Sequence, residues 1–165
     1  MSGVTWSIAP TPVEDPESAA TVRAYIDDIA SRFYGRQATD EEIDASLVDE
    51  PERQLMPPHG AFLLARAEGD DRVAGCVGVR LMEGGATAEL KRVWVAPHAR
   101  RRGLGSLLVE AAEREAAALG ATAIRLDTRD DLVEARRLYE RRGYVAIAPY
   151  NDSLYAEHWL EKKLP

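Results

Sequence analysis

The sequence predicts a mixed α/β fold with a mainly antiparallel central sheet flanked by helices. Three strand-like segments follow one another with only turns between them, which is the pattern of an antiparallel sheet. After them the chain alternates helix, strand, helix and strand, which is typical of a βαβ-like second half. With 165 residues and no repeat or linker-like stretch, we expect a single domain over 1–165.

Two helices are predicted before the first hairpin, after an opening segment of strand or coil. Over 17–36, apolar side chains recur at helical spacing: Val22, Ile26, Ile29 and Phe33. Thr39 followed by Glu42 is a capping-box pattern, which predicts a short helix ending near residue 48. Prolines then interrupt the chain at Pro51, Pro57 and Pro58.

Three strands and a long helix are predicted next. The strands cover 61–67, 73–82 and 88–95, and turn residues separate them. Pro97 ends the third strand, and a helix with one apolar stripe is predicted over 103–119.

The remaining segments complete the sheet. Residues 123–128 are predicted as a strand and 132–142 as a helix that Gly143 ends. Residues 144–147 and 157–164 are predicted as the last two strands.

Composition argues against several classes of protein. No stretch approaches the roughly 18 continuous apolar residues of a membrane span, and residues 1–12 lack the blocks of a signal peptide. Cys76 is the only cysteine, so no internal disulfide can form, and a cytoplasmic location is expected. The three histidines show no ligand spacing, so we expect no metal site.

The formal charge of −7 is unevenly distributed. Residues 1–70 carry a net charge of −9 and residues 71–165 a net charge of +2. Within the second part, residues 91–106 contain five basic side chains and no carboxylate. So acidic a chain is a poor partner for nucleic acid. A small anion bound at this local basic segment fits better.

The basic segment connects a strand to a long helix through an arginine- and glycine-rich turn. Free N–H groups and the positive end of the dipole at a helix start favour anions. Gly103 and Gly105 keep side chains away from those groups, so a diphosphate is the natural ligand. A tight turn with solvated arginines is the alternative. A dinucleotide-binding turn would need glycine at position 108, where the chain has leucine, and only Asp127 favours it.

Two motifs then resemble a known family. The run Val95-Ala-Pro-His-Ala-Arg100-Arg-Arg-Gly103-Leu-Gly105 resembles the acetyl-CoA signature of the GCN5-related N-acetyltransferase (GNAT) superfamily. Downstream, Ala135-Arg-Arg-Leu138-Tyr139-Glu-Arg-Arg-Gly143-Tyr144 is similar to its second motif. The segment 89–95 also resembles the central strand of one branch. The resemblance is good over about 88–144 and looser elsewhere.

This resemblance implies a GNAT-like acyl-CoA N-acyltransferase fold that binds acetyl-CoA. The backbone of 93–95 would pair with the pantetheine arm, N–H groups of 101–106 would hold the diphosphate, and strands 88–95 and 123–128 would splay apart. The implied cofactor contacts are Val93, Trp94, Val95, Arg100, Arg101, Arg102, Gly103, Leu104, Gly105, Ser106, Leu132, Ala135 and Tyr139. Leu132 departs from the asparagine that is frequent in the family.

Transfer to an amine needs a proton acceptor and a group that assists the leaving thiolate. The resemblance places Tyr139 as the donor to the thiolate; by spacing alone it would be a half-buried aromatic. Glu89 is the candidate base, directly or through water, and its alternative is a solvated carboxylate paired with Lys91 or Arg92. N–H groups near Trp94 or Val95 would stabilise the oxyanion. Cys76 lies in an apolar run and is expected to be a packed thiol, which favours direct transfer.

The acceptor pocket is expected across the sheet from the cofactor, with walls from 33–60, 83–87 and 149–159. The first wall is acidic, which would attract a cation or form a solvated helix face: Asp40, Glu41, Glu42, Asp44, Asp49 and Glu50. Four aromatics would line the pocket or simply pack: Tyr34, Tyr150, Tyr155 and Trp159.

The expected function is acetyl transfer from acetyl-CoA directly to a primary amine of a small molecule or amino acid. The alternatives are a non-catalytic acyl-CoA-binding module and a peptide or protein N-acetyltransferase. The expected partners are a small-molecule amine and, by analogy with the family, a second copy in a homodimer. Neither nucleic acid nor membrane is expected.

Overall fold

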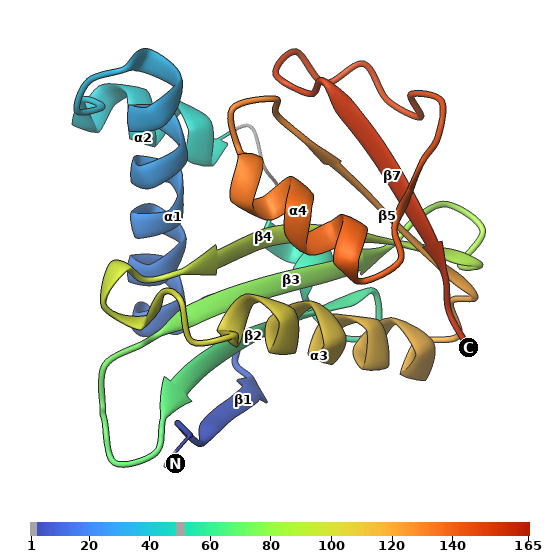
Figure 1. Cartoon of the computed structure of the whole chain (residues 1–165), viewed down its shortest axis with the longest axis horizontal. Coiled ribbons are helices and arrows are strands. Elements are labelled where there is room, and N and C mark those ends of the chain that lie inside the picture. Colours follow the sequence, from blue (N-terminus) through green and yellow to red (C-terminus); the bar gives the residue numbers. More distant parts are fainter. Residues whose placement is uncertain (1–2, 49–51) are drawn as a thin grey trace.

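The computed structural model describes residues 3–48 and 52–165 (Figure 1). The strands are β1 (Trp6–Pro10), β2 (Gly60–Ala67), β3 (Gly75–Leu81), β4 (Thr87–Val95), β5 (Ala123–Thr128), β6 (Val145–Ala146) and β7 (His158–Lys163). The helices are α1 (Pro16–Tyr34), α2 (Asp40–Val48), α3 (Leu104–Ala118) and α4 (Val133–Arg141), with 3-10 turns η1 (Glu52–Leu55) and η2 (Pro97–Ala99). Each predicted helix and strand is present, with ends shifted by a few residues, and the opening segment is a strand.

The strands form one sheet in the order β1-β2-β3-β4-β5-β7-β6. Neighbouring strands are antiparallel except for the parallel pair β4 and β5. The prediction of a mixed, mainly antiparallel sheet is therefore confirmed. The parallel pair arises because α3 carries the chain across one face of the sheet between the two strands (Figure 1).

The two central strands part after a short paired stretch. Only Thr87 to Glu89 of β4 pair with Ala123 to Arg125 of β5. Beyond these pairs the strands separate, and α4 lies in front of the gap (Figure 1). The predicted splaying of the two strands is confirmed, and it exposes the backbone edge of β4.

A bulge bends β4 beside this gap. Cys76 pairs with Trp94 and Gly78 with Lys91, so two residues of β4 lie opposite one residue of β3. The extra residue, Arg92, has a φ of 56°, which is uncommon for a residue with a side chain. The fully buried Cys76 thiol donates a hydrogen bond to the Arg92 carbonyl at 3.2 Å.

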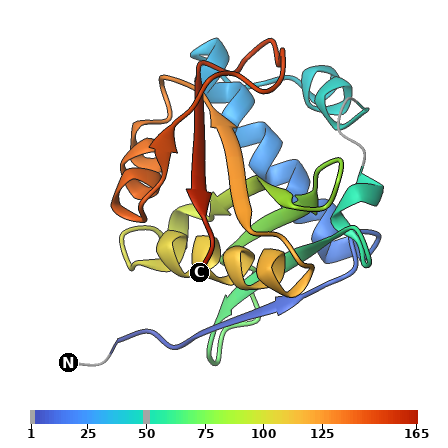
Figure 2. The same cartoon turned by 90° about the vertical axis from the view of Figure 1, so that its right-hand side faces the viewer.

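Two apolar cores hold the helices on opposite faces of the sheet (Figure 2). On one face α3 and α4 pack on the sheet through side chains such as Leu104, Leu108 and Tyr139. On the other face α1 and α2 pack through side chains such as Val22, Ile26 and Ile43. The gap between β4 and β5 is thus flanked by helices on both faces of the sheet. In the described part of the chain, no helix has the length and apolar character needed to cross a bilayer.

Candidate active site

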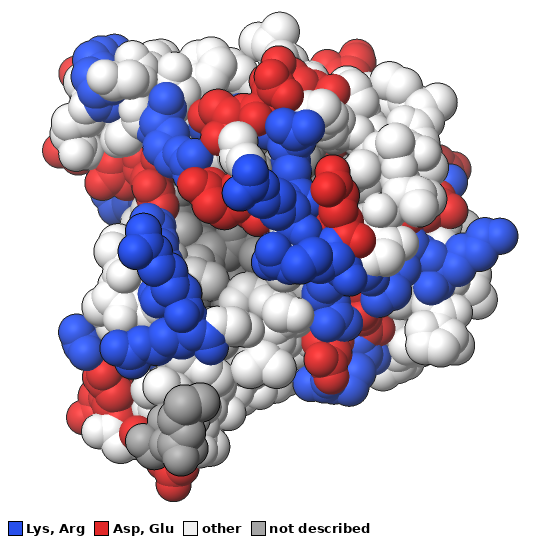
Figure 3. All heavy atoms as spheres, viewed as in Figure 1, with Lys and Arg blue, Asp and Glu red and all other residues white. Residues whose placement is uncertain are grey.

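A cleft of about 900 Å³ passes through the sheet where β4 and β5 part. It is lined by both strands, by α1, α4 and the start of α3, and by residues of the β6–β7 loop. Figure 3 shows the hollow between two groups of basic side chains, one over the β4–α3 turn and the other over α4. One continuous cavity therefore joins the basic side of the sheet to its other face.

The turn between β4 and α3 has the features of an anion cradle. Arg101 and Gly103 have φ values of 66° and 81°, which turn the chain sharply into α3. None of the backbone N–H groups of 101–106 donates a hydrogen bond to another described residue. They surround the positive end of a 15-residue helix, so a phosphate there would be stabilised by both hydrogen bonds and the helix dipole.

The two glycines of the turn have different local roles. Gly103 supplies the left-handed conformation before α3, and nothing lies within 4 Å of the place a Cβ would occupy. At Gly105 a Cβ would come within 3.2 Å of the Leu138 side chain. Gly105 therefore allows the close approach of α3 and α4 at the cleft.

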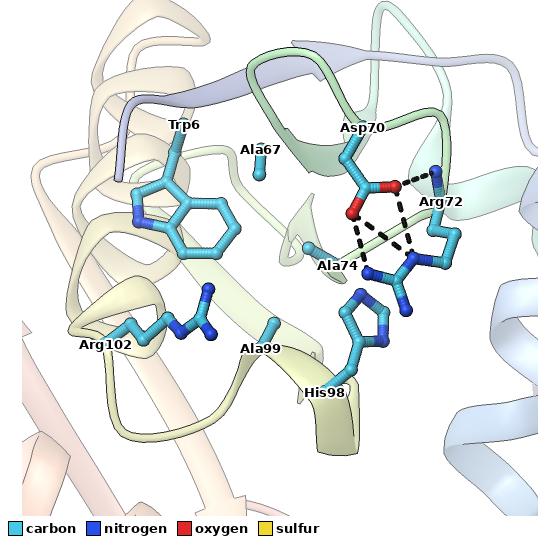
Figure 4. A pocket seen from close by; sticks show the side chains of 8 residues that line it. All are labelled: Trp6, Ala67, Asp70, Arg72, Ala74, His98, Ala99 and Arg102. Atoms are coloured by element: carbon cyan, nitrogen blue, oxygen red, sulfur yellow. Dashed lines mark hydrogen bonds and ion pairs between the residues drawn. The ribbon is translucent and has the colours of Figure 1, made fainter. Parts of the chain in front are cut away.

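The three successive arginines of the turn point to different surroundings. Arg100 donates hydrogen bonds to the Val95 carbonyl at 3.0 Å and to Asp28 at 2.6 Å, which ties the turn to α1. Arg101 lines the cleft. The Arg102 side chain lies instead beside Trp6 in a separate cavity of about 60 Å³ (Figure 4). The predicted cofactor contact of Arg102 therefore stays a prediction for its backbone N–H group. Its guanidinium faces the separate cavity and is not expected to contact the cofactor.

That second cavity contains a paired set of charges. Hydrogen bonds from Arg72 lower the pKa of Asp70 to about 2, and His98 faces the same carboxylate (Figure 4). The cavity is far smaller than a cofactor. We assign it no part in the chemistry.

Glu89 is buried at the point where β4 and β5 part. Its carboxylate accepts hydrogen bonds from Arg80 at 2.8 Å and from the Tyr150 hydroxyl at 2.7 Å, and Lys91 lies 3.9 Å away. Glu89 is thus neither a solvated strand-end carboxylate nor a simple partner of Lys91. Because a carboxylate offers about four acceptor positions, it still has capacity to accept a proton or a water.

Tyr139 lies on α4 and lines the cleft with most of its ring buried. Its hydroxyl has no hydrogen-bond partner among residues 3–48 and 52–165. Burial, and then the charge of Asp127, raise the pKa of Tyr139 above its usual range. The phenol is therefore protonated at neutral pH and free to donate into the cleft.

Asp127 forms the other carboxylate of the cleft, at the end of β5. It accepts a hydrogen bond from Asn151 at 2.8 Å, and Asn151 in turn accepts from the Trp159 indole at 2.9 Å. These contacts hold the β6–β7 loop over the end of β5. Side chains of Glu89, Asp127 and Tyr139 therefore line one cavity from three different elements.

The structure brings nearly all of the predicted cofactor residues to this cleft. Those that line it are Val93, Trp94, Val95, Arg100, Arg101, Gly103, Leu104, Gly105, Ser106, Leu132, Ala135 and Tyr139. Cys76 is fully buried, and burial raises the pKa of its thiol to about 12. The expectation of a packed thiol is confirmed.

The expected acceptor walls need correction. The 83–87 segment does not line the cleft, because it forms the β3–β4 turn at the end where β4 and β5 are paired. The acidic face of α2 does not line it either: Asp40 and Asp44 pair with Arg23, and Glu42 pairs with Arg36. Asp49 and Glu50 lie outside the described residues. Tyr34 and Tyr155 line the cleft, whereas Tyr150 and Trp159 support residues that do.

Comparison with known proteins decides the family. The sequence model of the acetyltransferase (GNAT) family matches residues 23–144, which include both motifs and the gap between the strands. The chain belongs to the GNAT family of acetyltransferases. An uncharacterised N-acetyltransferase of Schizosaccharomyces pombe is 38% identical over 71% of each chain. An IAA acetyltransferase of Azospirillum brasilense is 36% identical over 58% of this chain and 61% of its own.

Solved structures share the fold of this GNAT protein. A Klebsiella pneumoniae protein assigned as an acyl-CoA N-acyltransferase superposes with a TM-score of 0.72 at 27% identity, covering 97% of this chain and 98% of the other. The PaiA N-acetyltransferase of Thermoplasma acidophilum, solved with coenzyme A, gives 0.70 at 20% identity, with coverages of 96% and 99%. The protein is thus an acyltransferase enzyme, and acetyl-CoA is its cosubstrate. The free N–H groups of 101–106 and the open edge of β4 fit such a ligand.

Some residues of the cleft were missed by the sequence reasoning. Asp28 accepts hydrogen bonds from both the Trp94 indole and Arg100, although it lies far from them in sequence. Arg80 and Asn151 likewise meet their partners only through the sheet and the final loop. Asp127 did carry a signal, because it alternates with the buried Ile124 and Leu126 and so faces the opposite side of β5.

Proposed function

We propose that this GNAT enzyme transfers an acetyl group from acetyl-CoA directly to a primary amine of a small molecule or amino acid. One observation carries the proposal: a single cavity is lined by the anion cradle, by the Tyr139 phenol and by the carboxylates of Glu89 and Asp127. The cradle suits the diphosphate, and the carboxylates on the other side suit a cationic amine.

Two walls beside the acceptor half of the cleft favour a small acceptor over a protein. The last turn of α1 and the β6–β7 loop both line it, through residues such as Phe33 and Tyr155. Asn151 anchors that loop to β5 through Asp127. A peptide would have to bring its amine past these walls to reach Glu89, whereas a free amine carries no chain that must pass them.

Acetyl-CoA supplies the acetyl group as an activated thioester. Alkyl amines are mostly protonated near pH 7, so the amine must lose a proton before its nitrogen attacks. We assign this proton to Glu89, directly or through one water, because its carboxylate lines the cleft where the strands part. Arg80 and Tyr150 hold that carboxylate in one orientation.

Tyr139 assists the departure of the coenzyme thiolate. With its pKa raised by burial, the phenol keeps its proton across neutral pH. An alkyl thiol has a pKa of about 8.5, so hydrogen-bond donation to the sulfur is favoured over complete proton transfer. Backbone N–H groups at the end of β4 would stabilise the oxygen that gains negative charge.

Two substitutions test the assigned roles. We expect Tyr139→Phe to lower kcat by about 10- to 100-fold, with little change in the KM of acetyl-CoA. Glu89→Gln should lower kcat/KM by about 10- to 100-fold, because an amide cannot accept the proton of the amine. The measurement is release of free thiol across pH with an accepted amine. Unchanged profiles in both variants would remove both roles.

The rival function is a non-catalytic acyl-CoA-binding module. It predicts tight binding of acetyl-CoA by calorimetry without thiol release from any amine of a broad panel. A protein acetyltransferase would instead acetylate peptide termini or lysines and ignore free amines. The same panel, extended by two peptides, therefore separates the three functions.

A further inference from the structure

Two aromatic side chains meet across the acceptor end of the cleft. Phe33 lies in the last turn of α1 and Tyr155 in the β6–β7 loop, and their ring centroids are 5.0 Å apart at an interplanar angle of 78°. Figures 1 and 2 show both segments at the same end of the molecule. We call Phe33 and Tyr155 the aromatic bridge.

Other contacts hold α1 in place independently of the aromatic bridge. Arg32 donates hydrogen bonds to the Asp131 carbonyl at 2.8 Å and to Glu134 at 3.3 Å. Asp131 is itself held in place, because its carboxylate accepts a hydrogen bond from Arg129 at 2.9 Å. Arg32 would therefore still hold the end of α1 against residues 131–134 if the two rings were removed.

The rings are placed to limit what enters. Phe33 is 50% exposed and Tyr155 is 53% exposed, yet both line the cleft, so each presents one part to solvent and another to the cavity. One edge-to-face contact joins them, and such contacts are weak compared with core packing. A wide acceptor would have to separate the rings, whereas a narrow one passes beneath them.

We propose that the aromatic bridge sets the width limit for the acceptor, which makes Phe33 and Tyr155 specificity-determining residues. The proposal rests on the amine acetyltransferase function above. It predicts that narrow amines are acetylated well and that efficiency falls steeply with the width of the group next to the amine.

The test measures kcat/KM for two series of rising width. One series is propylamine, benzylamine and naphthylmethylamine, and the other is glycinamide, phenylalaninamide and naphthylalaninamide. We expect Phe33→Ala, Tyr155→Ala and the double variant to gain about tenfold or more with the widest member of each series. The narrowest members should change by less than about threefold, because they do not reach the rings.

Leu154→Ala is the matched control, because Leu154 precedes Tyr155 and is 86% exposed but does not line the cleft. It should leave the width profile unchanged. Thermal unfolding of each variant checks that the fold is kept. If the ratio of kcat/KM for wide and narrow amines is the same in the wild type and the double variant, the aromatic bridge alone is overturned. If acetyl-CoA binds but neither the wild type nor any variant releases thiol with any of these amines, both the proposed function and the aromatic bridge are contradicted.

Discussion

In the β4–α3 turn, the backbone conformation of one residue determines where two neighbouring arginine side chains point. Arg101 and Arg102 are both exposed, and neither has an ion pair among the described residues. Because Arg101 has a positive φ, the two side chains leave the turn in different directions. Arg101 lines the cleft, and Arg102 enters the small cavity beside Trp6.

We therefore predict unequal effects of removing these two charges. Arg101→Ala should weaken coenzyme A binding by about 10- to 100-fold, the loss of a charge-assisted hydrogen bond. Arg102→Ala should change the Kd by less than about threefold, because its side chain faces away. Titration calorimetry with coenzyme A measures both, and each variant controls the other. Equal losses would mean that the two guanidinium groups share the phosphates.

The candidate site was predictable from the sequence where residues are near one another in the chain. The motifs at 95–105 and 135–144 predicted that Tyr139 and the turn before α3 share one site, and residues of both line the same cleft. The partners of Glu89 were not predictable, because Arg80 comes from the adjacent strand and Tyr150 from a distant loop. Side-chain direction likewise could not be predicted for Arg102, since it depends on the φ of its neighbour.

At the scale of elements, sequence patterns predicted the structure best where the contacts join residues that are close in the chain. The capping box predicted from Thr39 and Glu42 is formed in full: the Glu42 N–H donates to the Thr39 hydroxyl at 3.1 Å, and the Thr39 N–H donates to the Glu42 carboxylate at 2.9 Å. The bulge in β4 had no such signal. It depends on the register against β3, which places Arg92 in a conformation that its residue type disfavours.

The capping box also predicts how α2 responds to acid. Hydrogen bonds from Arg36, then from the Thr39 N–H, lower the pKa of Glu42 from 4.5 to about 2. A lowered pKa in the folded state means that the contribution is complete above pH 4.5 and is lost as the pH falls toward 2. The difference in unfolding free energy between wild type and Glu42→Gln should be constant at neutral pH and shrink to nothing near pH 2.

Urea unfolding from pH 7 to pH 2 measures this difference. Glu41→Gln is the control, because the neighbouring Glu41 has no ion pair within the described ranges. Its difference from wild type should be small and flat over the same range. A Glu42→Gln difference that stays constant down to pH 2 would show that the Arg36 contact does not persist in solution.

At the scale of the whole molecule, the sheet is two groups of strands that join over a short length. Strands β1 to β4 meet β5 to β7 only through the pairs of Thr87 to Glu89 with Ala123 to Arg125. Hydropathy predicted the strands but not the gap, because a strand with one free edge has the same apolar pattern as a paired strand. Only the resemblance to the family predicted that these two strands would splay.

The packed helices are what join the two groups into one cooperative unit. Leu104 and Leu108 of α3 share a core with Ile124 of β5 and Tyr139 of α4. On the same face, the buried Glu113 of α3 accepts hydrogen bonds from Arg142, from Tyr144 and from Lys162 of β7. We propose on this basis that 1–165 is a single domain.

Coenzyme A should therefore shift one thermal transition as a whole. The cofactor site proposed for it is built from β4, α3 and α4 of the folded chain, and the unfolded chain has no such site. At free coenzyme A of about 100 times Kd, mass action adds about 2.7 kcal/mol to the free energy of unfolding. For a chain of this size that corresponds to a rise of about 5–10 °C in Tm. Calorimetric scans over a range of coenzyme A concentrations measure the shift, with adenosine as the control that lacks phosphates. A second transition that ignores coenzyme A would show that the strands beyond the gap unfold separately from the cofactor site.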